Sequence, residues 1–495
     1  MNLMNKCSTS LKLLERNSTF FRLYYKKPTD NDQLSVQKSR HPLSQTSGTL
    51  NADLRSIQNL IPFVPKQPYA KKHFSDQCDV VVIGGGAVGS SVAFWLKTRV
   101  RNGVRVIVIE KDPSYAKAST PLSCGGIRQQ FSLPENIQMS MFGAEFLRNL
   151  KSYLHVEGEN TPDVSFMPHG YLFLATDRSA QQLEENARLQ HQLGAKNELL
   201  SLSMLKKKFP WLDTTGIVLG CHGLENEGWF DPWSLLMAFK KKAISEGVEY
   251  VTGEVIGFEF RKMPDMLIEG VEPGTYETVE TVLVKTEDGE VRPIKFESAV
   301  IAAGANSRKV AEMARIGKGP GYLKTPLPVE PRKRYVYCFH CPNGPSQTPV
   351  VIDPTGTYFR REGGGHFICG KSPTEEEGEP NTEDLEVDYS YFDGCVWPYL
   401  AARVSAFEQL KVTNAWAGYY DTNVADENGI VGRHPYYHNL YIATGFSGHG
   451  IQQSPAVGRA VMEMMFEGGF KTIDLRRFGF ERLIHNELLR EVNII

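Results

Sequence analysis

The chain has 495 residues, enough for two or three domains of ordinary size, and 41% of them are hydrophobic, which suffices for a sizeable core. Its 55 Lys and Arg residues balance 57 Asp and Glu residues, so a nucleic-acid surface built on bulk charge is excluded. No stretch approaches the roughly 18 consecutive apolar residues of a membrane helix. We therefore expect no nucleic acid partner and at most peripheral contact with a membrane.

The first 76 residues predict a targeting segment followed by a linker. Residues 1–27 hold six basic side chains against Glu15 alone, with hydroxyl residues interspersed and leucines and phenylalanines at loosely helical spacing. This pattern is typical of a mitochondrial presequence, and an untargeted basic tail is the alternative. Residues 28–76 are polar and lack a helix or strand period, which predicts a flexible linker. We expect the protein in the mitochondrion, in the matrix or on the matrix face of the inner membrane.

A dinucleotide site is predicted directly after the linker. The apolar run 79–83 leads into a glycine-rich turn, and the apolar run 106–109 ends on Glu110, 21 positions after Gly89. Two buried strands around a helix would place a pyrophosphate on the helix N-terminus and the acid on a ribose hydroxyl. The residues predicted to hold this half of the ligand are Gly84, Gly86, Ala87, Val88, Gly89 and Glu110.

Three later segments are expected to meet the same ligand. They are the Ser- and Gly-rich loop 119–126, the end of the buried strand 298–305, and the turn 445–455 between a strand and a helix. The helix after that turn ends near residue 466, and its N-terminus could stabilise negative charge on the ligand. His449 in this turn could alternatively have only a structural role, with its hydrogen bonds satisfied inside the protein. The residues assigned here are Ser119, Gly125, Gly126, Gly304, Gly445, Gly448, His449 and Gly450.

The remaining pattern predicts a mixed α/β chain. A helix should begin after Asp231, which is followed by proline as an N-cap residue often is. Residues 254–297 alternate and contain turns, which indicates an antiparallel meander. The pair Cys338 and Cys341 has no second pair beside it, and we predict no metal site. Helices are expected at 136–150, 179–193, 203–209 and 232–245, and strands at 170–175, 246–251, 335–339, 357–361 and 366–369.

Four of these segments resemble one family. The turn 84–89 with Glu110, the loop 119–128, the segment 416–422 and the turn 445–455 are similar to the D-amino-acid oxidase-type FAD oxidoreductases, which include sarcosine oxidase and dimethylglycine dehydrogenase. The likeness covers about residues 77–480. It implies FAD as the cofactor and an α/β fold, in which a Rossmann-type FAD-binding domain carries an inserted antiparallel-sheet (α+β) domain.

The same resemblance suggests domain boundaries. The FAD-binding domain is expected in three parts and the inserted cap or substrate domain in two, followed by a C-terminal tail. The parts are 77–135, 226–325 and 413–480 for the FAD-binding domain, 136–225 and 326–412 for the cap, and 481–495 for the tail.

Within the family, residues 124–132, 227–232 and 331–337 look like a mitochondrial member that is associated with assembly of respiratory complex I. That resemblance implies complex I subunits or assembly intermediates as partners. Two functions stay open: an assembly or stabilising factor for complex I, and an amine dehydrogenase or oxidase. In the second, a hydride would pass from a substrate C–H bond to flavin N5.

Departures from the family shape the expected site. The loop 119–126 lacks the histidine, and the segment 416–422 the cysteine, that attach the flavin in some members, so FAD should be non-covalent. Gln452 stands where sarcosine oxidase-like enzymes hold the substrate carboxylate with lysine. Arg128 matches an arginine near the flavin, and Lys333 is the nearest candidate for an oxygen-activating lysine or else a solvated charge at a strand end. The predicted catalytic residues are Arg128, Lys333, Tyr419 and Gln452.

Overall fold

The computed structural model describes residues 74–492. The predicted presequence, residues 1–27, and the predicted linker up to residue 73 lie outside the described residues.

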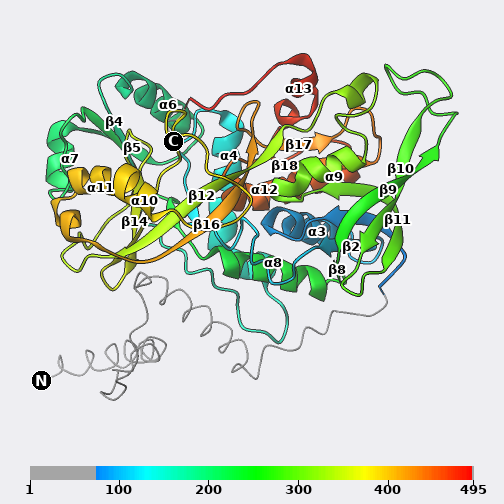
Figure 1. Ribbon diagram of the computed structural model, residues 1–495, viewed down its shortest axis with the longest axis horizontal. Coiled ribbons are helices and arrows are strands. Elements are labelled where there is room, and N and C mark those ends of the chain that lie inside the picture. The colour runs from blue at the N-terminus through cyan, green and yellow to red at the C-terminus, as the bar shows by residue number, and fades with distance from the viewer. Residues whose placement is uncertain (1–73, 493–495) are drawn as a thin grey trace, which may run out of the picture. The chain divides into compact units, whose positions relative to one another are not determined.

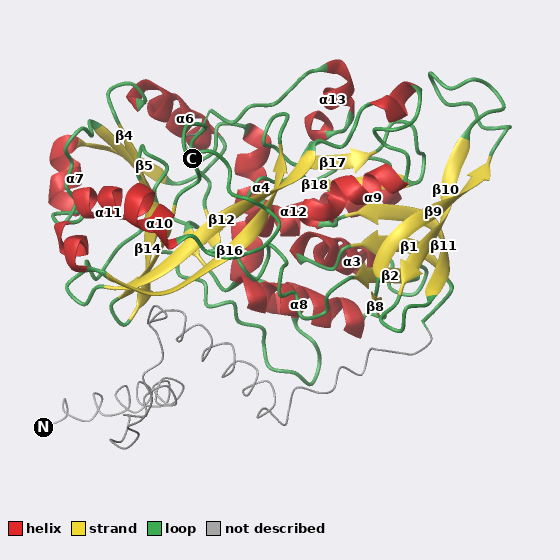
Figure 2. Cartoon of the chain, viewed as in Figure 1, coloured by secondary structure: helices red, strands yellow, loops and turns green. Residues whose placement is uncertain are grey.

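The first sheet carries the nucleotide motif and has eight strands (Figures 1 and 2). Its central strand β1 (Gln77–Ile83) pairs in parallel with β2 (Val106–Glu110) on one side and β11 (Val291–Ile301) on the other. Strands β8 (Glu249–Thr252) and β18 (Leu440–Thr444) extend the parallel part, and β17 (Ile430–Arg433) adds an antiparallel edge. Because parallel strands place their carboxyl ends at one edge, the turns after β1, β11 and β18 meet there.

The predicted meander is confirmed. Strand β9 (Glu254–Lys262) pairs antiparallel with β10 (Glu277–Lys285), which pairs antiparallel with the first half of β11. The second half of β11, from Lys295 onward, runs parallel to β1. One long strand therefore joins the meander to the nucleotide-binding sheet.

Helices α3 (Ala87–Arg99), α4 (Pro134–Arg148), α8 (Pro232–Ser245) and α12 (Gly450–Phe466) pack together against the first sheet, and Figure 1 shows α3, α12 and α8 beside its strands. Their side chains form one apolar core with β1 and β2, while α9 (Ser307–Met313) and the meander form a second core on the other face. The predicted cap of α8 is confirmed, because an Asp231 side-chain oxygen accepts the Trp233 N–H at 3.0 Å.

The second sheet also has eight strands, and its pairs are antiparallel except for one. Its order is β16 (Lys411–Asn423), β12 (Val329–His340), β15 (His366–Gly370), β14 (Tyr358–Gly363), β13 (Val350–Ile352), β4 (Tyr171–Ala175), β6 (Leu219–Gly223) and β5 (Asn197–Ser201). The long strands β12 and β16 run from this sheet toward the first one (Figure 1). The boundary expected at residue 413 falls inside β16.

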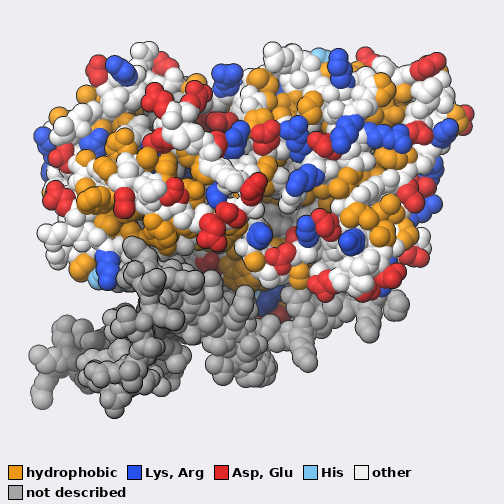
Figure 3. Space-filling model, in the orientation of Figure 1, with side chains coloured by type: hydrophobic (Ala, Val, Ile, Leu, Met, Phe, Trp, Pro, Cys, Tyr) orange, Lys and Arg blue, Asp and Glu red, His pale blue; other side chains and the backbone are white. Residues whose placement is uncertain are grey.

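Shorter elements complete the described residues. No helix within residues 74–492 is both long and apolar enough to cross a membrane. On the face drawn in Figure 3, basic and acidic side chains are intermixed. The short elements are β3 (Gly126–Ile127) paired with β7 (Gly228–Trp229), and the helices α5 (Leu150–Leu154), α6 (Ala180–Gln192), α7 (Leu202–Lys208), α10 (Tyr389–Tyr391), α11 (Trp397–Arg403) and α13 (Glu481–His485).

Candidate functional site

A cavity of about 1330 Å³ lies where the carboxyl ends of the first sheet meet β12 and β16. This volume exceeds the usual range for small-ligand pockets and suits a ligand as long as a dinucleotide. Most residues predicted for the site line it. They are Gly84, Gly86, Ala87, Val88, Glu110, Ser119, Gly126, Arg128, Gly304, Tyr419, Gly448, His449, Gly450 and Gln452.

The glycines of the first turn have different physical roles. A Cβ on Gly84, whose φ is +103°, would lie 2.3 Å from the Ala302 carbonyl oxygen, and one on Gly89 would lie 1.9 Å from the Gly84 carbonyl oxygen. These two positions let the chain and the helix approach the sheet closely. A Cβ on Gly86 would meet only the Thr120 hydroxyl, at 3.6 Å. The space above Gly86 is open to the cavity, as a pyrophosphate requires.

Glu110 closes this turn from the neighbouring strand. Its Oε2 accepts the Gly85 N–H at 2.8 Å, and its Oε1 accepts the Asp112 N–H at 2.9 Å. Burial raises the pKa of the carboxyl group, against the effect of these two hydrogen bonds. Each oxygen keeps lone pairs for the hydroxyl groups of a ribose.

Lys240 was missed by the sequence analysis and lies beside Glu110. Its side chain is buried on α8, and its Nζ donates to the Tyr115 hydroxyl at 3.2 Å. Burial lowers the pKa of Lys240, and the nearby Glu110 carboxylate opposes this shift. The regular helical pattern of α8 contains no signal that would single out this lysine, because its contact with Tyr115 joins residues 125 positions apart.

Asp421 holds the turn after β18. One carboxylate oxygen accepts the N–H groups of Gly445 at 2.8 Å and Phe446 at 3.2 Å, and burial raises the pKa of this acid. A Cβ added on Gly448 would lie 2.5 Å from Cε2 of the Tyr420 ring, so the ring packs directly on this glycine. The N-cap residue His449 makes no side-chain hydrogen bond to the start of α12, and residues 449–452 at this helix end line the cavity.

Arg128 is buried near the start of α12, at the end of the cavity that is here called the reactive end, and 5% of its surface is exposed. Its guanidinium carbon lies 4.4 Å from the ring centre of Phe131 and 5.2 Å from that of Phe173, and its Nη2 lies 3.1 Å from Nε2 of His449. Gln452 accepts the backbone N–H of Arg128 at 2.8 Å. These contacts fix both the backbone and the charged end of Arg128.

His449 is held neutral next to this arginine. Burial, with the positive charge of Arg128, lowers the pKa of the imidazole to about 3. A neutral ring can accept the Arg128 N–H through Nε2. The histidine therefore orients the guanidinium without adding a second charge.

Glu227 supports the loop that follows Arg128. One oxygen accepts the backbone N–H of Gln129 at 2.7 Å, and the other accepts the side-chain amide of Gln130 at 2.9 Å. Burial raises the pKa of Glu227 to about 7. In the sequence, Glu227 stands out only as the first residue of the segment 227–232 that carries the resemblance.

Two predicted catalytic residues, Lys333 and Tyr419, direct their polar groups toward the loop 374–386, although Tyr419 also lines the cavity. Lys333 is not part of the cavity lining: its Nζ lies 2.9 Å from an Asp384 oxygen and 3.3 Å from the Glu386 carbonyl. The Tyr419 hydroxyl donates to the Thr382 carbonyl at 2.8 Å. Both side chains thus contact the acidic loop 374–386. Arg334, the next residue after Lys333 on β12, lines the cavity because successive side chains of a strand point to opposite sides, and it pairs there with Glu379 of the same loop at 2.6 and 3.0 Å.

The other predicted glycines that lie outside the lining are structural. Gly89 was described above, and a Cβ on Gly125, whose φ is +71°, would lie 2.1 Å from the Phe230 carbonyl oxygen. Gly445 has φ +78° and donates to Asp421. Within residues 74–492 no cluster of three or more His, Cys, Asp or Glu side chains could hold a metal ion.

Residues 79–464 match the family described as FAD dependent oxidoreductase. The chain belongs to that family. It is 52% identical over 427 residues to FAD-dependent oxidoreductase domain-containing protein 1 of Xenopus laevis, with 85% of each chain covered. It is 50% identical over 453 residues to the Bos taurus protein of the same name, covering 90% of this chain and 93% of that one.

A solved structure, L-proline dehydrogenase from P. horikoshii, is similar with a TM-score of 0.69 and 28% identity, covering 84% of this chain and all of that one. The cofactor is FAD. The cavity fits it: the open space over Gly86 suits the pyrophosphate, Glu110 suits the ribose, and the uncapped start of α12 suits the ring end of the flavin. The predicted fold class is confirmed.

Proposed function

We propose that the cavity is the site of FAD-dependent oxidation of a C–N bond in an amine that carries a carboxylate. The observation that supports this proposal is Arg128. It is buried, it lines the cavity, and it forms no ion pair with an acidic side chain among the described residues. Its Nε has no hydrogen-bond partner in the described part of the chain. A buried cation with free donors favours an anionic ligand.

The residues around Arg128 define what the site can do. Arg128 would hold the carboxylate, His449 would keep the guanidinium in place, and the rings of Tyr420 and Phe173 would exclude water. Bound FAD supplies the acceptor for the hydride that a C–H bond next to the amine nitrogen gives up. L-Proline is itself a secondary amine with a carboxylate, so the similarity to an L-proline dehydrogenase agrees with this substrate class.

The test is anaerobic bleaching of the FAD-loaded protein by matched amines. Sarcosine, dimethylglycine and L-proline carry a carboxylate, whereas dimethylamine and pyrrolidine do not. We expect bleaching only within the first group, and loss of bleaching in Arg128→Met with FAD still bound. Bleaching that is equally fast with pyrrolidine and L-proline would contradict the role of Arg128, and absence of bleaching by every amine would contradict the proposed oxidation.

We propose further that the protein acts in the mitochondrion in the assembly or stability of respiratory complex I, with complex I subunits or assembly intermediates as its partners. The support is the basic, acid-poor segment 1–27 together with the resemblance carried by residues 124–132, 227–232 and 331–337. Deleting residues 1–27 should leave the protein cytosolic. Cells that lack the protein should accumulate incomplete complex I, and the full-length chain should restore it.

One double variant separates a catalytic from a non-catalytic role in assembly. Arg128→Ala with Gln452→Ala removes the carboxylate site and its backbone support, but spares Glu110 and the glycines around the ADP half of FAD. If assembly needs turnover, this variant fails to restore complex I although it binds FAD. If FAD only supports the fold or a binding surface, the variant restores complex I as well as the unaltered chain does.

A further inference from the structure

Residues 476–491, here called the tail segment, contact the reactive end of the cavity from far along the chain. The segment contains the short helices η6 (Arg476–Phe478) and α13, followed by an extended stretch. Glu491 of this stretch lines the cavity that Arg128 also lines. Most of this segment falls within residues 481–495, which were expected to form a C-terminal tail.

The Glu491 carboxylate is fully occupied by donors from one short region. Its Oε2 accepts the backbone N–H of Ser132 at 2.7 Å and the Ser132 hydroxyl at 2.5 Å. Its Oε1 accepts the Leu133 N–H at 3.2 Å and the side-chain amide of Asn136 at 2.6 Å. Four donors use the lone pairs of both oxygens, so Glu491 has none left for a substrate.

These donors surround the start of α4. Leu133 is the N-cap residue and has no side chain able to cap the helix. Glu491, 358 positions further along the chain, accepts the backbone N–H of this N-cap residue, and its negative charge lies beside the positive end of the helix dipole. Residues 128–131, which directly precede the residues that Glu491 binds, form the loop that carries Arg128.

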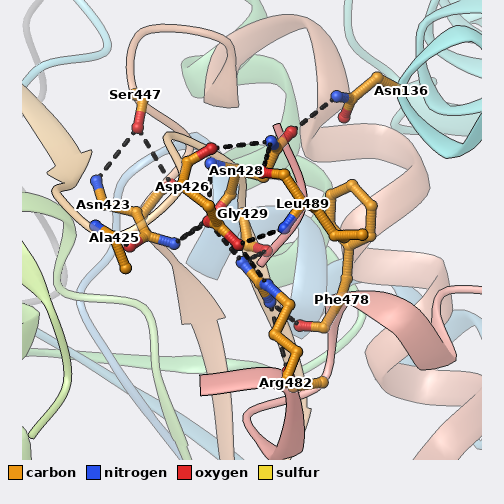
Figure 4. Close-up of polar contacts among 12 residues, drawn as sticks. Asn136, Asn423, Ala425, Asp426, Asn428, Gly429, Ser447, Phe478, Arg482 and Leu489 are labelled. Carbon is orange, nitrogen blue, oxygen red and sulfur yellow. Dashed lines mark hydrogen bonds and ion pairs between the residues drawn. The ribbon is translucent and has the colours of Figure 1, made fainter. Parts of the chain in front are cut away.

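A buried polar network connects the same segment to the turn after β18 (Figure 4). Arg482 forms a two-bond ion pair with Asp426, at 2.7 and 3.0 Å, and both side chains are almost fully buried. Asp426 accepts from the Asn423 amide, and the Asn423 backbone N–H donates to the Ser447 hydroxyl at 3.1 Å. Ser447 belongs to the turn that precedes α12.

The network closes on the Arg128 side through two asparagines. The Asn428 side chain donates to the Leu489 carbonyl at 2.9 Å and accepts from the Asn136 amide at 2.8 Å. Asn136 also accepts from Gln453 on α12 at 3.0 Å. The tail segment is thus bonded directly to the start of α4 and is linked through Asp426 and Asn423 to the turn before α12; Figure 4 shows Asn136, Asn428, Asp426 and Arg482 of this network.

We propose that Glu491 is a positioning residue of the site: by binding the N–H groups of Ser132 and Leu133 and the side chain of Asn136, it fixes the backbone of residues 128–136 and thereby the direction of the Arg128 guanidinium. The inference rests on the proposed function only for what Arg128 binds. The carboxylate is fully hydrogen-bonded and cannot take part in the chemistry, yet every donor it satisfies lies between Arg128 and the first turn of α4.

The test compares Glu491→Gln and Glu491→Ala with the control Glu487→Gln, whose side chain is exposed on the same segment. The glutamine keeps the shape but replaces one acceptor with a donor, which faces the donors of Ser132 or of Asn136. Acetate serves as the probe of the Arg128 site, through its effect on the flavin absorbance of the FAD-loaded protein. Hydrogen exchange of residues 128–136 is followed in parallel.

We expect both Glu491 variants to retain FAD, to bind acetate about tenfold more weakly, and to exchange faster within residues 128–136, while Glu487→Gln behaves as the unaltered chain. Unchanged acetate affinity and unchanged exchange in Glu491→Gln would overturn the proposal. If acetate leaves the flavin spectrum of the unaltered protein unchanged, the proposal that Arg128 binds a carboxylate is wrong. The hydrogen-exchange rates of residues 128–136 then decide alone whether Glu491 positions this loop. If Glu491→Ala does not fold, Ser132→Ala gives the same comparison with one donor removed.

Discussion

Removing the Glu110 carboxylate should weaken FAD binding without unfolding the protein. The carboxylate takes two backbone N–H groups, from Gly85 and Asp112, and presents its remaining lone pairs to the cavity. Two charge-assisted hydrogen bonds to ribose hydroxyls at about 1.5 kcal/mol each give about 3 kcal/mol, or roughly 150-fold in the FAD Kd. We expect at least a tenfold loss for Glu110→Ala.

The assay is a titration of apoprotein with FAD, followed by quenching of flavin fluorescence. Glu259→Gln is the matched control, because Glu259 is an exposed acid on β9 outside the cavity lining. Thermal unfolding of both apoproteins separates a loss of stability from a loss of affinity, since Gly85 and Asp112 also lose an acceptor in the Ala variant. A Kd within twofold of the unaltered chain, at full occupancy of folded protein, would refute the assignment of Glu110 to the ribose.

Three further predictions concern the cofactor bond, pH and packing. Acid precipitation should release FAD into the supernatant, and fluorescence that stays with the denatured chain on a gel would contradict non-covalent binding. Because burial raises the pKa of Glu227 to about 7 from 4.5, the folded state favours its protonated form. The stabilisation that this group contributes is complete below pH 4.5 and is lost as the pH rises through 7, by about 3 kcal/mol at most. The free energy of unfolding in urea should therefore differ less between pH 5 and pH 8 in Glu227→Gln than in the unaltered chain. An equal difference in the two proteins would contradict the raised pKa of Glu227. Gly89→Ala should abolish FAD binding, because the added Cβ would lie 1.9 Å from the Gly84 carbonyl oxygen. The control Gly257→Ala should retain FAD, because its added Cβ would have its nearest contact at 3.6 Å. FAD retention by Gly89→Ala would show that α3 can move away from β1.

The support of Arg128 could not be read from the chain. Glu227 contacts Gln129 and Gln130 across 98 and 97 positions, and Glu491 contacts residues 132–136 across 355 to 359 positions. Neither acid lies in a hydrophobic or turn pattern that differs from that of an ordinary surface acid. Lys333 and Arg334 are adjacent cations in the sequence, and only the pairing of β12 with its neighbours decides which of them faces the cavity. Long-range pairing of this kind is set by the packing of the whole fold.

The sequence by itself determined the nucleotide-binding unit, because all the information for that unit is local. A buried strand, a turn that needs glycine, a helix N-terminus and an acid at the end of the next strand follow one another within about 30 residues. The same holds for the start of α8 at Asp231. The tertiary structure alone decided how the reactive end is built, because Arg128, His449, Asp421, Glu227 and Glu491 come from separate segments and meet only when the two sheets and the helices between them have packed.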